Sequence, residues 1–504
     1  MNNNQKRYDN LSTYDLSNKV IGHQFWCFRT TKTGMLISGL YFLNIRLWLM
    51  EQGYFKRTIN GESVFVHIRS GVMTKVTPEI IRDVIMKEIE DNQLPIDFKY
   101  NEINYIFSKN CLLQHFFQYN PSSFSDNALK QLDADNTPIL KDEKDKAYFL
   151  FKNVIVIAAA GELLALTYAD LKDKVVWNDH IIPYDFQINN DHQCHFLDFL
   201  KNVCDKDDER LRSLKSVIGY LLHNYQAPTS GKAVVFYDQK ISTSAGNPMG
   251  GSGKGLLTNG LGIFRNLRRL DGKDFSEKNT FKYAMVTEDT QLVAIDDVKS
   301  TFQFSVLHSV LTEGYTINKK FKNQFTIPLE NGPKTIITSN YLLHAKGTTN
   351  LRRLVEVELS DHYSKKIITG VEKPIEEEHH CVFFSEDWDA AQWNSFFNLG
   401  MECIQLFLRE GILINAKQFK YQRLRQEVGM DFLEYIEDKI SPGLKYNTSE
   451  IYGDFGKDFP LFDVPMTQRK FSDCIREWAV YNGLEYVASS SNGQQYFILN
   501  GKPK

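Results

Sequence analysis

The chain has 504 residues, 42% of them hydrophobic and 24% charged, and its formal net charge is −3. This length argues against a single domain, so we expect three or four domains, with the composition of an ordinary soluble globular protein. The total charge gives no sign of nucleic-acid binding, so any such surface has to be local.

Residues 1–140 are predicted to form an α+β domain of unclear role. Short strand-like runs such as "SVFVHI" (63–68) are mixed with a helix that begins at Thr77-Pro78, where Thr77 can cap the helix and Pro78 suits its first turn. The opening residues have no apolar core, so we expect no secretion signal there.

Residues 141–230 are predicted to hold a strand pair followed by helices. The apolar stretch 154–168 is short and is interrupted by Glu162, so a strand pair explains it better than a membrane span, and we expect no membrane partner. Residues 194–225 carry apolar residues at helical spacing on either side of "DKDDE", which predicts two helices.

From residue 231 to about residue 370, apolar strands alternate with helical stretches. This pattern is typical of a parallel sheet that is buried on both faces. The predicted strands are "AVVFYD", "LVAIDD", "KTIITSN" and "RRLVEVEL".

The stretch "GNPMGGSGKGLL" (246–257) is a candidate phosphate-binding loop. It has the glycines and the Gly-Lys pair of such loops, but Gly255 stands where they have serine or threonine. A strand at 232–238 and a helix at 255–267 supply the expected setting, because backbone N–H groups and a helix N-terminus together hold the phosphates. A Gly-Ser-rich linker with one lysine is the alternative. The predicted nucleotide-binding residues are Gly250, Gly251, Ser252, Gly253, Lys254 and Gly255.

Three further motifs follow the loop in order. Asp296 and Asp297 end an apolar strand, where a magnesium ion held by Asp296 and a water polarised by Asp297 would explain paired carboxylates. A solvated strand end is the alternative. Asn340 ends the next strand and can orient the attacking water. Arg352 and Arg353 can complete a neighbouring subunit's site, although such a pair is more often a surface feature.

Residues 401–504 are predicted to form a helical linker and a small winged-helix-like DNA-binding domain. Three helices followed by a hairpin suggest this fold, at residues 430–440, 448–459, 467–484 and 485–499. Arg469 and Lys470 begin the third helix, where a recognition helix meets DNA. A winged helix that makes protein contacts alone is the alternative.

The seven cysteines are scattered without a CxxC pair, which fits reduced thiols in a cytoplasmic protein. Two His/Cys groupings, "HQCH" (192–195) and "HHC" (379–381), have no second half at zinc-site spacing. We therefore expect them to be surface loop residues and not metal ligands.

The order of the glycine loop, "AIDD", "LTEGYTINKKFKNQFTIP" (311–328), "TIITSN" and "RRL" resembles that of superfamily three helicases. The resemblance is strongest to primase–helicase proteins of phages and mobile elements, whose helicase part is similar to the poxvirus replication ATPase. It covers residues 190–400, and the block ending in "IGYLLHNY" resembles the collar before that helicase domain. The family implies a multidomain α/β fold with an AAA+-type core (231–400). That core assembles as a ring, usually a hexamer, and uses ATP and Mg²⁺ to move 3′-to-5′ on single-stranded DNA.

By motif, the resemblance implies a Walker A lysine, two Walker B acids, a sensor and an arginine finger. These are Lys254, Asp296, Asp297, Asn340, and Arg352 or Arg353. Lys319, Lys320 and Lys322 match a hairpin of the ring's central channel. Basic residues alternate there with Phe321 and Phe325, which suits contact with phosphates and bases. A plain basic surface hairpin is the alternative.

Two features depart from the family. Gly255 removes the hydroxyl that normally binds magnesium. Residues 1–190 show no primase motif, so we expect no priming by this chain and allow for a separate primase or replication partner.

The sequence thus predicts an ATP-dependent, ring-forming DNA helicase for the replication of a phage or mobile element, acting on single-stranded and forked DNA. One alternative is a nucleotide-switched, DNA-binding replication initiator or loader without unwinding activity. Another is a defence or packaging ATPase with the same core. The paired acids favour hydrolysis over a pure switch, and the channel lysines favour DNA over a protein substrate.

Overall fold

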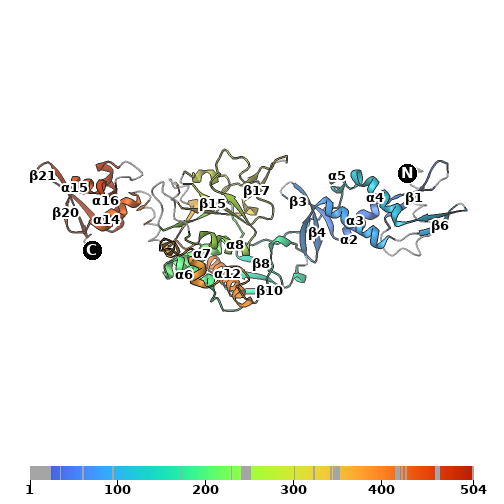
Figure 1. The fold of residues 1–504 in the computed structure, drawn as a ribbon, viewed down its shortest axis with the longest axis horizontal. Coiled ribbons are helices and arrows are strands. Elements are labelled where there is room, and N and C mark those ends of the chain that lie inside the picture. The colour runs from blue at the N-terminus through green and yellow to red at the C-terminus, as the bar shows by residue number, and fades with distance from the viewer. Residues whose placement is uncertain are drawn as a thin grey trace. The chain divides into compact units, whose positions relative to one another are not determined.

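The chain separates into two units, Met1–Leu140 with Leu166–Ile181, and Lys141–Ala165 with Ile182–Lys504 (Figure 1). The computed structural model describes residues 24–33, 36–59, 62–93, 96–100, 102–171, 173–228, 230–239, 251–299, 301–321, 324–340, 343, 352–414, 421, 424–425, 428–459 and 466–501.

The first unit mixes helices with short strands, which pair antiparallel except for β11 with β5. Its helices are α2 (Phe42–Glu51), α3 (Pro78–Asn92), α4 (Lys109–Ser123) and α5 (Asp126–Leu129). Its strands are β1 (Trp26–Thr30), β2 (Leu36–Leu40), β3 (Tyr54–Ile59), β4 (Glu62–Arg69), β5 (Val72–Val76), β6 (Ile96–Tyr100), β7 (Ile103–Phe107) and β11 (Val176–Trp177). Strands β3, β4, β5 and β11 form one sheet, whereas β1–β2 and β6–β7 are separate ribbons.

Helix α3 begins at Pro78, as its sequence predicts, but the capping hydrogen bond expected from Thr77 is not formed. Thr77 occupies the N-cap position without a side-chain capping hydrogen bond. Its hydroxyl instead hydrogen-bonds Glu79, which lowers the pKa of that exposed carboxyl. The expected capping role of Thr77 is therefore wrong.

The second unit opens with a small sheet and a group of helices. The sheet order is β10 (Leu163–Leu166), β9 (Ile155–Ala159), β8 (Lys146–Phe151) and β12 (Ile181–Ile182). Strands β9 and β10 are the pair predicted at 154–168. The helices are α6 (His195–Val203), α7 (Asp208–Leu222), α10 (His362–Ile368), α11 (Pro374–His379) and α12 (Ala390–Glu410). The two helices predicted around "DKDDE" (205–209) are α6, which ends before it, and α7, whose first turn includes its last two residues, Asp208 and Glu209.

A five-stranded, all-parallel sheet forms the centre of this unit, which confirms the predicted parallel sheet. Its order is β14 (Leu267–Asp271), β15 (Leu292–Val298), β18 (Lys334–Ser339), β13 (Ala233–Asp238) and β19 (Leu354–Leu359). Helix α8 (Lys254–Phe264) follows β13. The hairpin β16 (Gly314–Ile317) and β17 (Phe325–Pro328) lies between β15 and β18 in sequence.

Both faces of the sheet are buried, because alternate residues of a strand point to opposite sides. Val234 and Phe236 pack into a core with α6, α7, α8 and α12, which gather on one side of the sheet (Figure 1). Val235 and Tyr237 pack into a second core that includes Tyr315 of the hairpin β16–β17. This two-sided burial fixes the register that places the polar residues at the strand ends.

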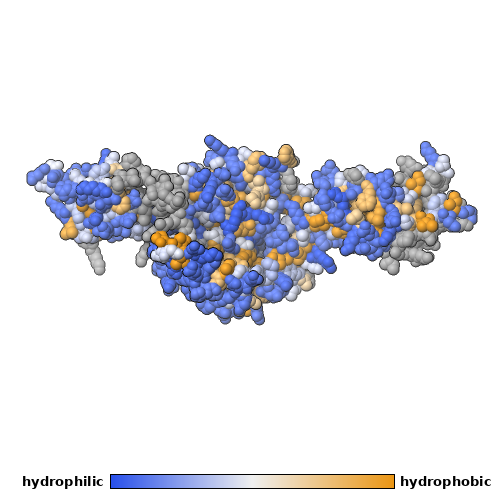
Figure 2. All heavy atoms as spheres, in the orientation of Figure 1, coloured by the Kyte–Doolittle hydropathy of each residue, from blue (hydrophilic) through white to orange (hydrophobic). Residues whose placement is uncertain are grey.

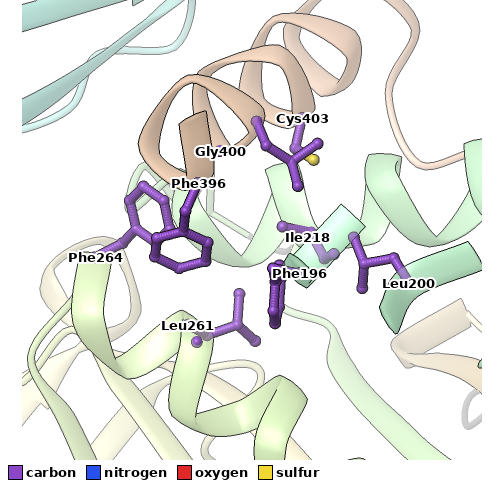
Figure 3. A pocket seen from close by; sticks show the side chains of 10 residues that line it. Phe196, Leu200, Ile218, Leu261, Phe264, Phe396, Gly400 and Cys403 are labelled. Atoms are coloured by element: carbon purple, nitrogen blue, oxygen red, sulfur yellow. The ribbon is translucent and has the colours of Figure 1, made fainter. Parts of the chain in front are cut away.

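Helix α8 packs against the helices α6, α7 and α12 through large apolar side chains (Figure 3). Phe264 approaches α12 so closely that a Cβ atom on Gly400 would lie 2.3 Å from its ring. The cavity left between these helices measures about 10 Å³ and is lined by apolar residues. It sits at the lower limit for one water molecule and offers no polar partners, so it is a packing gap and not a ligand site.

Buried charges also join this helical group to the sheet. Lys334, the first residue of β18, is 1% exposed and donates to the carbonyl oxygen of Tyr220 in α7 at 2.6 Å. Arg265, directly after α8, pairs with Asp142 at 3.0 Å. Burial lowers the pKa of Lys334 well below its ordinary value. These contacts lie at the amino-terminal edge of the sheet, away from the polar strand ends.

Among the described residues from 428 to 501, the chain forms three helices and a three-stranded sheet. The helices are α14 (Met430–Lys439), α15 (Thr448–Asp458) and α16 (Gln468–Tyr481), and the strands are β20 (Lys445–Asn447), β21 (Leu484–Ser491) and β22 (Gln494–Gly501). The three helices and the hairpin β21–β22 match the predicted positions within about three residues. Strand β20, which adds to this hairpin, has no counterpart in the sequence prediction.

The His/Cys groupings differ from the expectation of surface loops. Cys194 is buried at the start of α6, and His379 is buried at the end of α11, where it hydrogen-bonds the Tyr363 hydroxyl at 2.7 Å. Apolar packing around α6 and α11 explains their burial. Within the described ranges, no group of three potential ligand side chains could hold a metal ion.

The visible face of the molecule is mostly hydrophilic, with hydrophobic groups distributed among the polar ones (Figure 2). Among the helices of the described residues, none has the length and hydropathy that crossing a membrane requires.

Candidate nucleotide site

The glycine loop enters α8 through two left-handed residues. Gly251 and Gly253 both have φ of +98°, a conformation in which a side chain would be strained. A Cβ atom on Gly253 would lie 2.6 Å from the ring of Phe199 in α6, and one on Gly251 would lie 2.3 Å from Ile367 in α10. The loop therefore needs glycine at both positions, and α6 and α10 support it from outside. Gly250 lies outside the described residues.

Lys254, the first residue of α8, directs its ammonium group to the carboxyl ends of two central strands. Its Nζ donates to Asp238 Oδ1 at 2.6 Å and to Asn340 Oδ1 at 2.8 Å. A third, longer contact of 3.4 Å reaches Ser252 Oγ. The structure thus brings Lys254 and Asn340 together, as expected of residues that follow neighbouring parallel strands.

The two acids lie one strand further along the same edge. Asn340 Nδ2 donates to Asp297 Oδ1 at 2.9 Å, and Thr338 donates from its hydroxyl to Asp296. Asp297 has φ of +57°, and the register of β15 against β18 shifts between Ile295 and Val298. This bulge turns both carboxylates toward the strand ends, so Lys254, Asn340, Asp297 and Asp296 form one polar row.

Basic side chains from β14 and the turn after it contact both acids. Arg269 Nη1 lies 3.2 Å from Asp296 Oδ2, and Lys273 Nζ lies 3.2 Å from Asp297 Oδ2. The side chains of these pairs are between 35% and 62% exposed, so each pair contributes about 0–1 kcal/mol. Ligands can therefore replace these contacts at little cost.

Sequence reasoning missed several members of this site. Asp238 ends the strand "AVVFYD" just as Asp296 and Asp297 end "LVAIDD", so the same rule, an acid at the end of a buried strand, would have found it. Thr338 is hidden within a strand, and its role depends on the register of β15 against β18. Strand β14, which supplies Arg269, was not predicted because its sequence is rich in arginine.

Arg352 and Arg353 lie at the amino-terminal ends of the strands, opposite the carboxyl ends that carry Lys254 and the acids. They precede β19, whose Leu354 pairs with Ala233 at the start of β13, whereas Leu359 pairs with Asp238 at its end. Five residue steps of about 3.3 Å separate these two levels, or roughly 17 Å. Within one chain, the arginine pair is therefore not brought to Lys254.

The hairpin β16–β17 presents part of the predicted DNA-contacting segment. Lys320 and Phe321 are exposed at its tip, Phe321 completely, and Lys319 Nζ lies 5.4 Å from the centre of the Phe325 ring. Phe325 is only 7% exposed and packs in the sheet core, so the expectation that its ring can contact bases is wrong. Its position in a strand facing the core explains this. Lys322 lies outside the described residues.

Arg469 and Lys470 are exposed in the first turn of α16. Thr467 caps this helix by accepting from the Lys470 backbone N–H at 3.3 Å. Both basic side chains are thus held at a helix start, as predicted, while the nature of their ligand stays a prediction.

The site fits a nucleotide phosphate chain with its metal. Two left-handed glycines at the start of α8 leave room for phosphates where side chains would lie, and a helix N-terminus favours anions. Asp296 and Asp297 offer the carboxylate oxygens that Mg²⁺ prefers. Gly255 contributes no hydroxyl, but a Cβ atom there would meet no atom within 4 Å.

Gly255→Ser is therefore expected to be accommodated and to lower the Mg²⁺ concentration required for tight ATP binding several-fold, by restoring an oxygen ligand. Gly255→Ala is the matched control, because it adds the same Cβ without the hydroxyl. Both variants should gain up to about 1 kcal/mol in stability from the replaced helical glycine. Magnesium titrations of nucleotide binding that coincide for the serine and alanine variants would contradict the prediction.

A family model matches part of the chain. Residues 247–353 match the model of DUF5906, a family of unknown function. The DUF5906 segment, as we call these residues, contains every predicted nucleotide-site residue from Gly250 to Arg353 and leaves out Asp238. No curated protein matches the chain.

Two kinds of solved structure are similar to the chain. The A form apo structure of the NrS-1 C-terminal region covers 90% of this chain and 99% of its own, at 10% identity and a TM-score of 0.38. The X-ray structure of JCV helicase covers 47% of this chain and 64% of its own, at 14% identity and a TM-score of 0.26. The predicted resemblance to helicases is thus confirmed as a resemblance.

Proposed function

We propose that this chain is an ATP-dependent DNA helicase that assembles as a hexameric ring and serves the replication of a phage or mobile element. The observation that carries the proposal is the polar row at the carboxyl edge of the parallel sheet. Lys254, Asn340 and Asp297 are joined there by hydrogen bonds of 2.8 and 2.9 Å, next to the start of α8. Ligands of parallel α/β sheets bind at this edge.

Each residue of the row has a distinct role in hydrolysis. The loop N–H groups and Lys254 bind the phosphates, and Asp296 would hold Mg²⁺, which would neutralise phosphate charge. Asp297 accepts a hydrogen bond from the attacking water, and Asn340 orients that water. Because Asn340 contacts both Lys254 and Asp297, one side chain links the phosphate-binding group to the water-polarising group.

The arginine pair completes the site of a neighbouring subunit. Arg352 and Arg353 lie roughly 17 Å from the nucleotide edge of their own sheet, by the strand register given above. In a closed ring, each subunit presents one edge of its core to the next subunit. An arginine supplied across that boundary stabilises the charge of the transition state.

DNA passes through the ring along the hairpin β16–β17. Lys319, Lys320 and Lys322 contact phosphates, and the exposed ring of Phe321 stacks on a base. The last part of the chain is a winged-helix-like domain in which Arg469 and Lys470 contact duplex DNA.

Strand displacement on forked DNA, measured together with ATP hydrolysis, tests the function. Lys320→Ala is expected to reduce displacement and the stimulation of hydrolysis by single-stranded DNA, because it removes a phosphate contact. Lys278→Ala removes an exposed lysine elsewhere in the core and should change neither. ATP binding without displacement by the wild-type chain would favour an initiator or loader over a motor.

The proposed duplex contact has its own readout. Binding of duplex DNA should weaken in the double variant Arg469→Ala/Lys470→Ala and should depend less steeply on salt. Unchanged duplex binding would assign α16 to protein contacts.

A further inference from the structure

Asp238 is a buried acid in direct contact with the lysine of the phosphate loop. It is the last residue of β13, and its carboxylate lies 2.6 Å from Lys254 Nζ. The two side chains are only 7% and 12% exposed. Neither the predicted motifs nor the DUF5906 segment includes Asp238.

The contacts of Lys254 leave it no free donor. An ammonium group has three N–H donors, and the partners within reach are Asp238 Oδ1, Asn340 Oδ1 and Ser252 Oγ at 2.6, 2.8 and 3.4 Å. A phosphate oxygen can gain a hydrogen bond from Lys254 only if one of these partners gives it up.

The Asp238–Lys254 pair differs from the other ion pairs of the site in burial. The Arg269–Asp296 and Lys273–Asp297 pairs are at least 35% exposed on each side, so water screens them. Water screens the Asp238–Lys254 pair far less, and a charge-assisted hydrogen bond in such a setting is strong. Among these three pairs, this one therefore competes most strongly with a ligand.

We propose that Asp238 is a positioning residue that holds Lys254 in the nucleotide-free state and competes with the phosphates for it. The inference rests on the proposed function, since it concerns the same nucleotide site. When phosphates take over Lys254, the Asp238 carboxylate stays near them at the end of β13, and like charges repel. Asp238 thus weakens nucleotide binding, which favours release of ADP after each turnover.

The test measures the dissociation constants of ADP and of a non-hydrolysable ATP analogue with the full-length chain, without and with Mg²⁺. Asp238→Asn keeps the shape of the side chain and removes its charge, and it should tighten binding of both nucleotides about tenfold without Mg²⁺. Asp271→Asn is the matched control, because Asp271 also ends a strand at this edge but is exposed and bonds the backbone N–H of Lys273. That variant should leave both dissociation constants unchanged.

A double-mutant cycle with Lys254→Met separates release of Lys254 from a general change in charge. Lys254→Met should weaken ADP binding more in the Asp238→Asn background than in the wild-type background. With Asp238 present, Lys254 has to break its ion pair before it binds a phosphate, so its net contribution to binding is smaller. Thermal unfolding of each variant shows whether it is folded.

Additive effects in the cycle, or unchanged binding by Asp238→Asn, would overturn the proposal. Weaker binding by Asp238→Asn only when Mg²⁺ is present would overturn it as well and would make Asp238 a metal ligand. Absence of nucleotide binding in the folded wild-type chain would instead refute the proposed function itself.

Discussion

Replacing Lys254 by alanine is expected to reduce the rate of ATP hydrolysis by about 10²–10³-fold. The ammonium group is the positive charge at the start of α8, and removal of one such donor from a transition state costs about this much. Release of inorganic phosphate, with and without single-stranded DNA, measures the effect. Turnover at the wild-type rate would disprove the assignment of the nucleotide site.

Loss of folding must be separated from loss of chemistry in this variant. Lys254→Ala leaves Asp238 buried at 7% exposure without its ion pair, and removing one partner of a buried pair costs about 3–5 kcal/mol. The double variant Lys254→Ala/Asp238→Asn removes both charges and should recover much of that stability in thermal unfolding. It should remain unable to hydrolyse ATP, which would show that the defect is catalytic.

Subunits that lack the arginine pair are expected to be rescued by subunits that lack Lys254. Arg352→Ala/Arg353→Ala should reduce hydrolysis about 10³–10⁵-fold, the usual contribution of an arginine finger, and Lys254→Ala should be inactive. In a mixed ring, an intact Lys254 site can face an intact arginine pair, so partial activity returns. The measurement is ATP hydrolysis across mixing ratios of the two variants.

The strand register gives the physical reason for this rescue. The arginine pair and the nucleotide edge lie at opposite ends of β19 and β13, so one subunit cannot supply both to the same site. If activity does not return at any mixing ratio, the arginines act within their own subunit. Their role would then be structural.

The buried centre of the fold was predictable, because a strand covered on both faces must be apolar along its length. This rule found β13, β15 and β18, an alternation of apolar and polar residues located β19, and the glycine loop located α8. It missed β14, whose "LRRLD" sequence has two partly exposed arginines. Both β14 and β19 are edge strands, but apolar and polar residues alternate in "LVEVEL" of β19 and do not alternate in "LRRLD" of β14, so the sequence pattern reveals only β19.

The sequence predicts the residues of the candidate site only where they lie at the end of a recognisable strand or at the start of a recognisable helix. Lys254, Asp297 and Asn340 each follow or begin a recognisable element, and they meet because parallel strands end at one edge. Asp238 ends β13 at this same edge and follows the same rule, whereas the contact of Thr338 with Asp296 depends on the register of β15 against β18, which no local pattern encodes. The same reason applies to His379 and Cys194, whose burial depends on helices distant in sequence.

The contacts of Phe199 and Ile367 with the phosphate loop bear on which residues the nucleotide-binding domain needs. Both side chains lie outside the DUF5906 segment, as do β13 and β19. A chain cut at residues 247 and 353 would lack β13, which lies between β18 and β19, and the edge strand β19. It would also lack both side chains that support the loop. We therefore expect that residues 247–353 do not fold by themselves. The phosphate loop is supported by residues on both sides of the DUF5906 segment, Phe199 before it and Ile367 after it.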